Sequence, residues 1–385
     1  MRARACLRSG QRLEEIGEEA CQDEGVCVYA SSWVRALAER LIPGPVEIVV
    51  TDGEKGRDGQ RRVLTVADPL LSLCMLARNE ARNVTGCIRK ELYQGFGPGL
   101  APEKLYSLKD LVKLIVIVGL THGRAYGGFG GASPLTTCAQ RLYLVDLIGL
   151  QFQQPYNTGR LVLHGPGVPR GELDDEIFSR VVGEPRPTLD DVQRDKTGRY
   201  RRCGGGTVYF DTHAYQSFVA FDFCQACVAL NAAVASRATG DALHFKFLRY
   251  GAGFFSGAYQ AMISANIHLG VARGVEVYGR TASFKAQNAI RYLELPFFPR
   301  SEEILRACEP LGIRCLFSHD DALKPPSTPD CVLAVTNCAD PHVVTGNEMH
   351  HSSVDAAIAE NLRDRGASFS PFLNRRMRTE VVSVQ

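Results

Sequence analysis

Strand and helix signals alternate through the second half of this chain, and that alternation limits the fold more than any other feature. Apolar segments of strand length occur at residues 207–210, 244–248, 290–295, 314–318 and 332–335, and helical patterns separate most of them. Such alternation predicts an α/β fold built on a mostly parallel sheet. The last segment, Val332 to Val335, is apolar throughout, which is typical of a strand covered on both faces.

Polar chemistry is concentrated in the loop that follows this last strand. The loop and the start of the next helical pattern contain Asn337, Asp340, His342, Asn347, Glu348, His350, His351 and Asp355. Ligands of open α/β sheets bind in the crevice beyond the carboxyl ends of the strands. The carboxylates of Asp340, Glu348 and Asp355 are therefore candidates for a catalytic site. Each also has a structural interpretation: Asp340 and Glu348 suit turns, and Asp355 with Ser352 has the spacing of a capping box.

Three glycines with the spacing GxGxxxG join the segment at 244–248 to the next helix. The dinucleotide-binding fingerprint has its third glycine one residue earlier, so a nicotinamide enzyme is not indicated. Glycines still let the backbone approach a ligand closely, and amides at a helix start can hold a diphosphate. The alternative is a simple turn whose aromatic rings enter the core. The candidate ligand-binding residues here are Gly251, Ala252, Gly253, Phe254, Phe255, Ser256 and Gly257.

Composition narrows the class of protein. A formal net charge of +2 argues against a broad nucleic-acid-binding surface. Because the chain has no run of 18 apolar residues, we expect no membrane span. The 13 cysteines are odd in number and lack framework spacing, which favours reduced thiols in a cytoplasmic protein. Cys224 and Cys227 form a CxxC pair within an apolar helical segment, where core packing explains them better than metal binding or redox chemistry.

A glycine- and proline-rich stretch at 95–104 predicts a domain boundary. Residues 1–104 are expected to form an N-terminal helical and α+β extension, and residues 105–385 the main domain. The expected elements are helices within 11–42, a hairpin from 46–50 and 63–66, and helices at 69–95 and 107–120. The charged segment at about 169–202 has the composition of an insert, with a lid as one interpretation. A second glycine-rich run at 123–131 favours a surface loop over a phosphate-binding one.

Histidines beside the acidic residues raise the alternative of a metal site. Asp340, His342, Glu348, His350 and His351 have suitable ligand chemistry. No HxxxH or HExxH pair places two of them on one helical face, so the metal interpretation is the weaker one.

Several motifs resemble those of a known family. The sequences NCADPH (337–342), TGNE (345–348) and SSVDAAIAENL (352–362), with the loop YGAGFFSG (250–257), resemble the MavL-like arginine-specific macrodomains. This family is an atypical branch of the macrodomain fold and is related to poly(ADP-ribose) glycohydrolases. The resemblance covers roughly residues 105–365, with its specific motifs near the carboxyl end. It implies a macrodomain-like three-layer α/β/α fold with a mixed, mostly parallel sheet.

The resemblance also implies roles for individual residues. Asp340, Glu348 and Asp355 would form an acidic catalytic cluster, although the family has an aspartate where this chain has Glu348. The loop at 251–257 would hold the diphosphate of ADP-ribose, and a glycine run would border the distal ribose. The glutamate pair that follows this run in poly(ADP-ribose) glycohydrolases is missing here, which argues against cleavage of ADP-ribose chains. The remaining residues expected to bind ADP-ribose are Gly204, Gly205, Gly206, Asn337, His342 and Asn347.

Together these observations predict a hydrolase that removes mono-ADP-ribose from arginine side chains of proteins, without a cofactor or metal ion. Carboxylates stabilise an oxocarbenium-like transition state, position the attacking water and attract a guanidinium group. The expected partners are proteins mono-ADP-ribosylated on arginine, with neither nucleic acid nor a membrane involved. A non-catalytic ADP-ribose reader is the first alternative, a metal-dependent hydrolase the second and an interaction scaffold the third.

Overall fold

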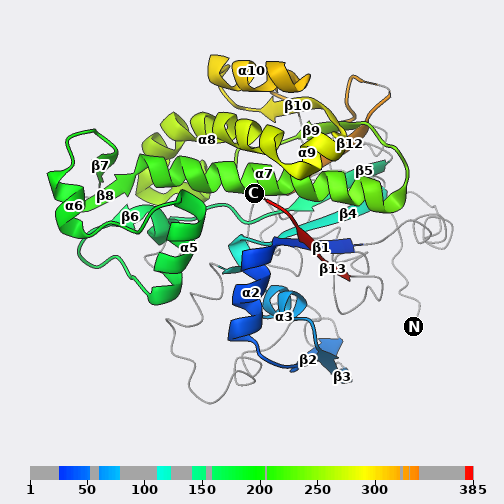
Figure 1. The fold of residues 1–385 in the computed structure, drawn as a ribbon, viewed down its shortest axis with the longest axis horizontal. Coiled ribbons are helices and arrows are strands. Elements are labelled where there is room, and N and C mark those ends of the chain that lie inside the picture. The colour runs from blue at the N-terminus through cyan, green and yellow to red at the C-terminus, as the bar shows by residue number, and fades with distance from the viewer. Residues whose placement is uncertain are drawn as a thin grey trace.

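The computed structural model describes residues 26–52, 60–78, 111–122, 141–152, 158–203, 206–320, 324–328, 330–337 and 378–384. Their largest unit is an eight-stranded sheet in the order β11-β10-β9-β12-β5-β4-β1-β13 (Figure 1). Its strands are β1 (Val26–Ser31), β4 (Val116–His122), β5 (Arg141–Asp146), β9 (Leu243–Lys246), β10 (Ile290–Pro296), β11 (Arg314–Ser318), β12 (Val332–Asn337) and β13 (Arg378–Val382). Neighbouring strands are parallel except where β4 pairs with β1 and β5. The predicted α/β class with a mixed, mostly parallel sheet is confirmed.

The strand β12 lies in the middle of this sheet, between β9 and β5. Leu333, Ala334, Val335 and Thr336 are all buried, so both faces of the strand are covered. Alternate side chains point to opposite faces of a strand, and a run of apolar residues is therefore stable only where both faces are removed from water. The prediction of a doubly covered strand at 332–335 is confirmed.

Two long helices, α7 (Thr212–Arg237) and α8 (Gln260–Arg280), run side by side across one face of the sheet (Figure 1). Two glycines of α8 permit their close approach. A Cβ at Gly270 would lie 2.5 Å from the Cβ of Val219, and one at Gly274 would lie 2.9 Å from that of Phe223. The helices α9 (Ala282–Ala286) and α10 (Glu302–Cys308), with the 3-10 turn η8 (Glu309–Leu311), complete this layer.

The helix α7 belongs to the core. Among the described residues it alone is long and apolar enough to cross a membrane by length and composition, and 83% of its most apolar window is buried within the fold. Burial between the sheet and α8 accounts for that composition. Cys224 and Cys227 lie inside this helix, and burial raises the pKa of the Cys224 thiol to about 12, as expected for a core residue.

A smaller lobe packs against α7. It contains a three-stranded sheet in the order β6-β8-β7, formed by β6 (Leu163–His164), β7 (Tyr200–Cys203) and β8 (Val208–Asp211). The helices α5 (Glu172–Val182) and α6 (Leu189–Arg194) and the turn η5 (Thr158–Val162) complete it. Ile177 and Phe178 of α5 are fully buried in the same core as α7. The segment at 169–202 is thus folded onto the body of the protein, while its action as a lid stays a prediction.

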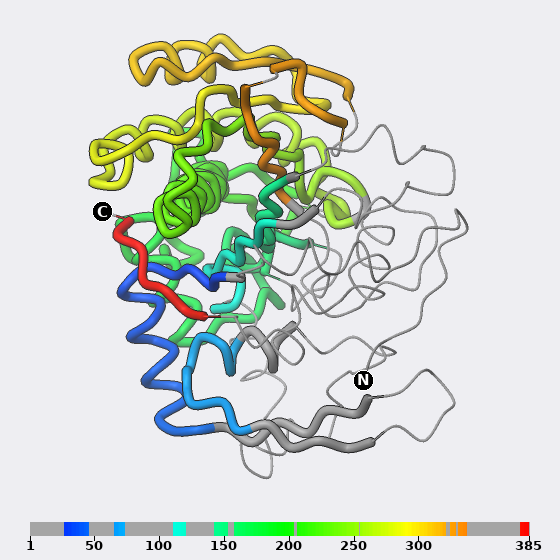
Figure 2. Tube along the Cα trace, turned by 90° about the vertical axis from the view of Figure 1, so that its right-hand side faces the viewer, coloured from blue at the N-terminus to red at the C-terminus, as the bar shows by residue number. Residues whose placement is uncertain are grey.

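The amino-terminal region corrects two predictions. The helix α2 (Ser32–Leu41) and the hairpin of β2 (Val46–Asp52) with β3 (Gln60–Val66) are confirmed, and α3 (Pro69–Arg78) covers the start of the helix expected at 69–95. Residues 26–31, expected to be helical, form β1, which pairs with β4 and β13 (Figure 2). The helix predicted at 107–120 is wrong from residue 116 onward, because the β-branched run Val116-Ile117-Val118 forms the buried strand β4. The boundary at residue 104 stays a prediction, and β1 before it shares a sheet with β4 after it.

Candidate functional site

Five parallel strands end at the same edge of the large sheet. They are β5, β12, β9, β10 and β11, whose last residues are Asp146, Asn337, Lys246, Pro296 and Ser318. The register places Asn337 directly beside Asp146. Because ligands of open α/β sheets bind beyond such an edge, it is the candidate site.

The glycine loop at 251–257 follows β9 at this edge. Gly251 has a φ of 67°, and a Cβ there would lie 2.8 Å from the carbonyl oxygen of Leu150. Gly257 has a φ of 52° and a ψ of −133°, a conformation that strongly favours glycine. The 3-10 turn η7 (Phe254–Tyr259) begins after Gly253 and includes Gly257. In its first turn, the backbone N–H and Oγ of Ser256 both donate to the carbonyl oxygen of Gly253, at 3.0 and 2.6 Å. The loop leads directly into α8. The positive φ angles show that backbone geometry favours glycine at positions 251 and 257.

Three hydrogen bonds hold this loop, together with Leu248 and Tyr250 just before it, to neighbouring segments. The backbone N–H of Leu248 donates to Oγ1 of Thr336 on β12 at 2.8 Å. The backbone N–H of Phe152, after β5, donates to the carbonyl oxygen of Phe255 at 2.8 Å. The hydroxyl of Tyr250 donates to the buried carboxylate of Asp222 on α7 at 2.9 Å. The chain from Leu248 to Phe255 is therefore fixed to β12, to α7 and to the segment that follows β5.

An aromatic cluster supports the loop from the side of the small lobe. Tyr259 lies 5.3 Å from Phe152 and 6.1 Å from Phe210 of β8, measured between ring centroids. Burial, and the nearby Cys203 thiol, raise the pKa of the Tyr259 hydroxyl. Cys203 precedes the glycine run, and Gly206 at the end of that run has a φ of 90°. Tyr259, which follows the loop, thus packs against Phe210 of the small lobe.

A pocket of about 550 Å³ opens beside the loop, at the ends of β10 and β11. It is lined by Arg249, Ser264, Phe297, Phe298, Pro299, Arg300, Phe317, Ser318 and His319. Its volume is in the range of small-molecule sites. Phe297 is 56% exposed and has a φ of 61°, which is rare for a bulky residue, and its ring contacts that of His319 edge-on at 5.6 Å. A strained, exposed aromatic residue in a pocket is a candidate ligand contact.

A buried polar network lies beneath this pocket. Ser318 donates from Oγ to Glu294, and the other carboxylate oxygen lies 2.6 Å from Nε2 of His244. Burial acts to raise the pKa of Glu294, but hydrogen bonds from His244 and Ser318 and the charge of Lys246 outweigh it and lower the pKa. Glu294 is thus an anion, held among donors below the pocket.

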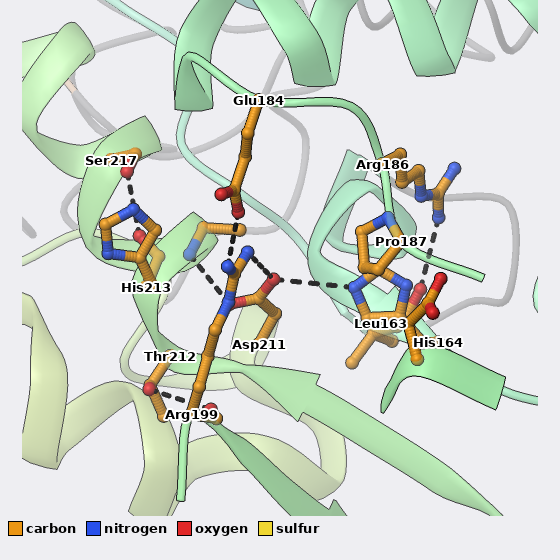
Figure 3. A network of polar contacts seen from close by, with 12 residues as sticks. Leu163, His164, Glu184, Arg186, Pro187, Arg199, Asp211, Thr212, His213 and Ser217 are labelled. Atoms are coloured by element: carbon orange, nitrogen blue, oxygen red, sulfur yellow. Dashed lines mark hydrogen bonds and ion pairs between the residues drawn. The ribbon is translucent and has the colours of Figure 1, made fainter. Parts of the chain in front are cut away.

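A second polar network lies in the small lobe (Figure 3). Arg199 donates from Nε and Nη2 to the two oxygens of Asp211 at 2.8 and 2.6 Å, and it also pairs with Glu184. Asp211 caps α7 by accepting from the backbone N–H of Ala214 at 2.9 Å, and His164 lies 3.6 Å from it. Asp211 is fully buried, so its carboxylate serves this lobe and offers no oxygen to a ligand.

The predicted site residues divide between the described part of the chain and the remainder. The loop at 251–257 and the strand end at Asn337 are brought to one edge of the large sheet, and Gly206 lies between β7 and β8 of the small lobe. Asp340, His342, Asn347, Glu348, Asp355, Gly204 and Gly205 lie outside the described residues, as do His350, His351 and the run at 123–131. Within the described ranges, no three His, Cys, Asp or Glu side chains come together as a metal site.

The pocket was missed in the sequence. Its residues come from four separate segments that are joined only by strand pairing, and the one local signal is the aromatic pair Phe297-Phe298 directly after an apolar strand. Comparison of the chain with known family models and with curated proteins gives no match.

Proposed function

We propose that this protein has a macrodomain-like α/β/α fold and hydrolyses the bond between mono-ADP-ribose and arginine side chains of proteins. One observation supports this most: Leu248, three residues before the glycine loop, is hydrogen-bonded to β12, and Asp340 follows the last residue of β12 by three positions in the chain. This supports a site in which the loop holds the diphosphate and the acidic segment that follows β12 supplies the catalytic carboxylates.

ADP-ribose has a place for each of its parts in this arrangement. Backbone amides of the loop and the start of α8 suit the diphosphate, because the helix dipole is positive there. The neighbouring pocket suits the adenosine end, with Phe297 as an aromatic surface for the base. Arg249 links the two, since it lines the pocket and precedes Gly251 by two residues. The distal ribose would then face the end of β12 and the glycine run that ends at Gly206.

The proposed chemistry uses carboxylates alone. Asp340, Glu348 and Asp355 would stabilise the positive charge that develops on the ribose, and one of them would position or deprotonate the attacking water. The same cluster would attract the guanidinium group of the modified arginine. The seven free cysteines of the described residues accord with the proposed cytoplasmic location.

Calorimetric titration with ADP-ribose, combined with an assay on arginine-ADP-ribosylated protein, tests this proposal. Wild-type protein is expected to bind ADP-ribose and release it from arginine, and Asp340→Ala is expected to abolish release. Binding without release by the wild type would make the protein a reader. Absence of binding would contradict the proposal, and loss of activity with a chelator would favour the metal-dependent alternative.

The role of the loop is tested by a matched pair of glycine variants. Gly251→Ala puts a Cβ 2.8 Å from a backbone oxygen at a φ of 67°, and we expect ADP-ribose affinity to fall about tenfold. Gly240→Ala makes the same change at a φ of 65°, with no atom within 4 Å, at the amino end of β9. If both variants bind equally well, the loop does not hold the ligand.

A further inference from the structure

The charge of the pocket exceeds what the adenosine end of ADP-ribose requires. Two arginines and a histidine line it, and none of the nine described lining residues is a carboxylate. An adenine base and its ribose are neutral, and the diphosphate is already assigned to the loop at 251–257. With ADP-ribose itself bound in this way, the guanidinium groups of Arg249 and Arg300 therefore meet no anionic group of the ligand within the pocket.

Contacts within the protein compensate these charges only in part. Arg249 donates from Nη2 to Ser264 at 2.5 Å, but its buried Nε–H finds no acceptor in the described part of the chain. Arg300 is 73% exposed and its Nε lies 3.2 Å from Glu302, an exposed pair of the kind that contributes little. Below the pocket, Glu294 already accepts from Ser318 and His244. Asp320, beside the lining residue His319, pairs with Lys324 at 2.7 Å.

We infer that the preferred ligand is an ADP-ribose that carries a further phosphate on its adenosine ribose. This inference rests on the proposed function, because it places the adenosine end in the pocket. A phosphate monoester presents several acceptor oxygens to a planar guanidinium fork, which suits Arg300 at the open rim, and the positive charge of Arg249 in the pocket wall favours the same anion. The phenyl ring of Phe297 would contact the base at the same time.

The test compares ADP-ribose with 2′-phospho-ADP-ribose by calorimetric titration of the full-length protein. We expect the phosphorylated ligand to bind about tenfold more tightly, in keeping with charge-assisted hydrogen bonds in a half-open site. The preference should shrink as salt is raised, because exposed charges are screened. In Arg300→Gln the ratio of the two affinities should fall to about one, while Arg300→Lys should keep part of it.

Arg280→Gln is the matched control. It removes the same charge from an exposed arginine at the far end of α8, roughly 24 Å along the helix from the lining residue Ser264. It should keep the tenfold preference. Equal affinities for the two ligands in the wild type, with ADP-ribose binding intact, would overturn this inference and leave the proposed function standing. If neither ligand binds, both fail.

Discussion

Two buried histidine–carboxylate networks, in two regions of the molecule, show how similar groups serve different purposes. In the small lobe, Asp211 accepts from Arg199 through both oxygens and caps α7, with His164 at 3.6 Å. Under the pocket, Glu294 accepts from Ser318 and lies 2.6 Å from His244. The first network is closed, since its carboxylate is fully buried and every contact stays within the lobe and the start of α7. The second reaches an open pocket through Ser318, so a ligand can contact it. We therefore expect the buried carboxylate of Asp211 to stabilise the small lobe, and the buried carboxylate of Glu294 to hold Ser318 at the pocket.

The largest effect is expected from breaking the closed network. Asp211→Ala leaves Arg199 with an uncompensated charge and removes the cap of α7, and we expect the free energy of unfolding to fall by about 3–5 kcal/mol. Urea unfolding followed by circular dichroism measures it. Asp190→Ala, which removes an exposed carboxylate of the same lobe that pairs with the exposed Arg194, should change the midpoint little. A loss no greater than that of the control would show that the network does not hold the lobe, and altered ADP-ribose affinity of the folded variant would show that it is not closed.

Features with a local sequence pattern could be predicted, and features assembled from distant segments could not. Strands β9, β10, β11 and β12 could be predicted from apolar runs of strand length. Helix α7 could be predicted from a long helical segment that is apolar on all sides. Strand β4 was predicted as helix because a short buried apolar run has no periodicity that separates strand from helix. The glycine loop was found because backbone geometry at Gly251 and Gly257 restricts residue type at fixed positions. The pocket and both networks were missed because their members meet only through strand pairing between distant segments.

An intermediate effect is expected at Phe297, which lines the pocket above the second network. Here the free energy of unfolding should rise while the affinity for ADP-ribose falls. Phe297→Gly removes a bulky residue from a φ of 61°, and left-handed geometry costs a non-glycine residue roughly 1–2 kcal/mol. Part of that gain is offset by the flexibility of glycine in the unfolded chain, so we expect stabilisation by at most about 1 kcal/mol. Affinity for ADP-ribose should fall about tenfold with loss of the aromatic surface.

Thermal unfolding and calorimetric titration of the same preparations test both halves of this prediction. Leu316→Gly is the control, because it removes an exposed apolar residue from the ordinary strand β11 and should only destabilise. A Phe297→Gly variant that loses stability like the control would mean that no strain is stored there. Unchanged affinity would remove Phe297 from the proposed binding surface.

The smallest expected effect is a difference in the pH range over which each network contributes to the free energy of unfolding. Burial lowers the pKa of His164 below its ordinary value of 6.5, so the unfolded chain binds that proton more readily than the folded one. The contribution of neutral His164 is therefore complete above about pH 6.5 and is lost as the pH falls toward the folded pKa. The pKa of Glu294 is lowered from 4.5, because the hydrogen bonds from His244 and Ser318 outweigh burial, so its contribution is complete above pH 4.5 and is lost only at lower pH. Plots of unfolding free energy against pH should therefore have a smaller slope than wild type below pH 6.5 in His164→Gln, where His213 and His268 still contribute, and below pH 4.5 in Glu294→Gln. If His164→Gln instead keeps the full wild-type slope below pH 6.5, burial does not keep His164 neutral in the folded protein, and burial is then not what distinguishes this network from the one under the pocket.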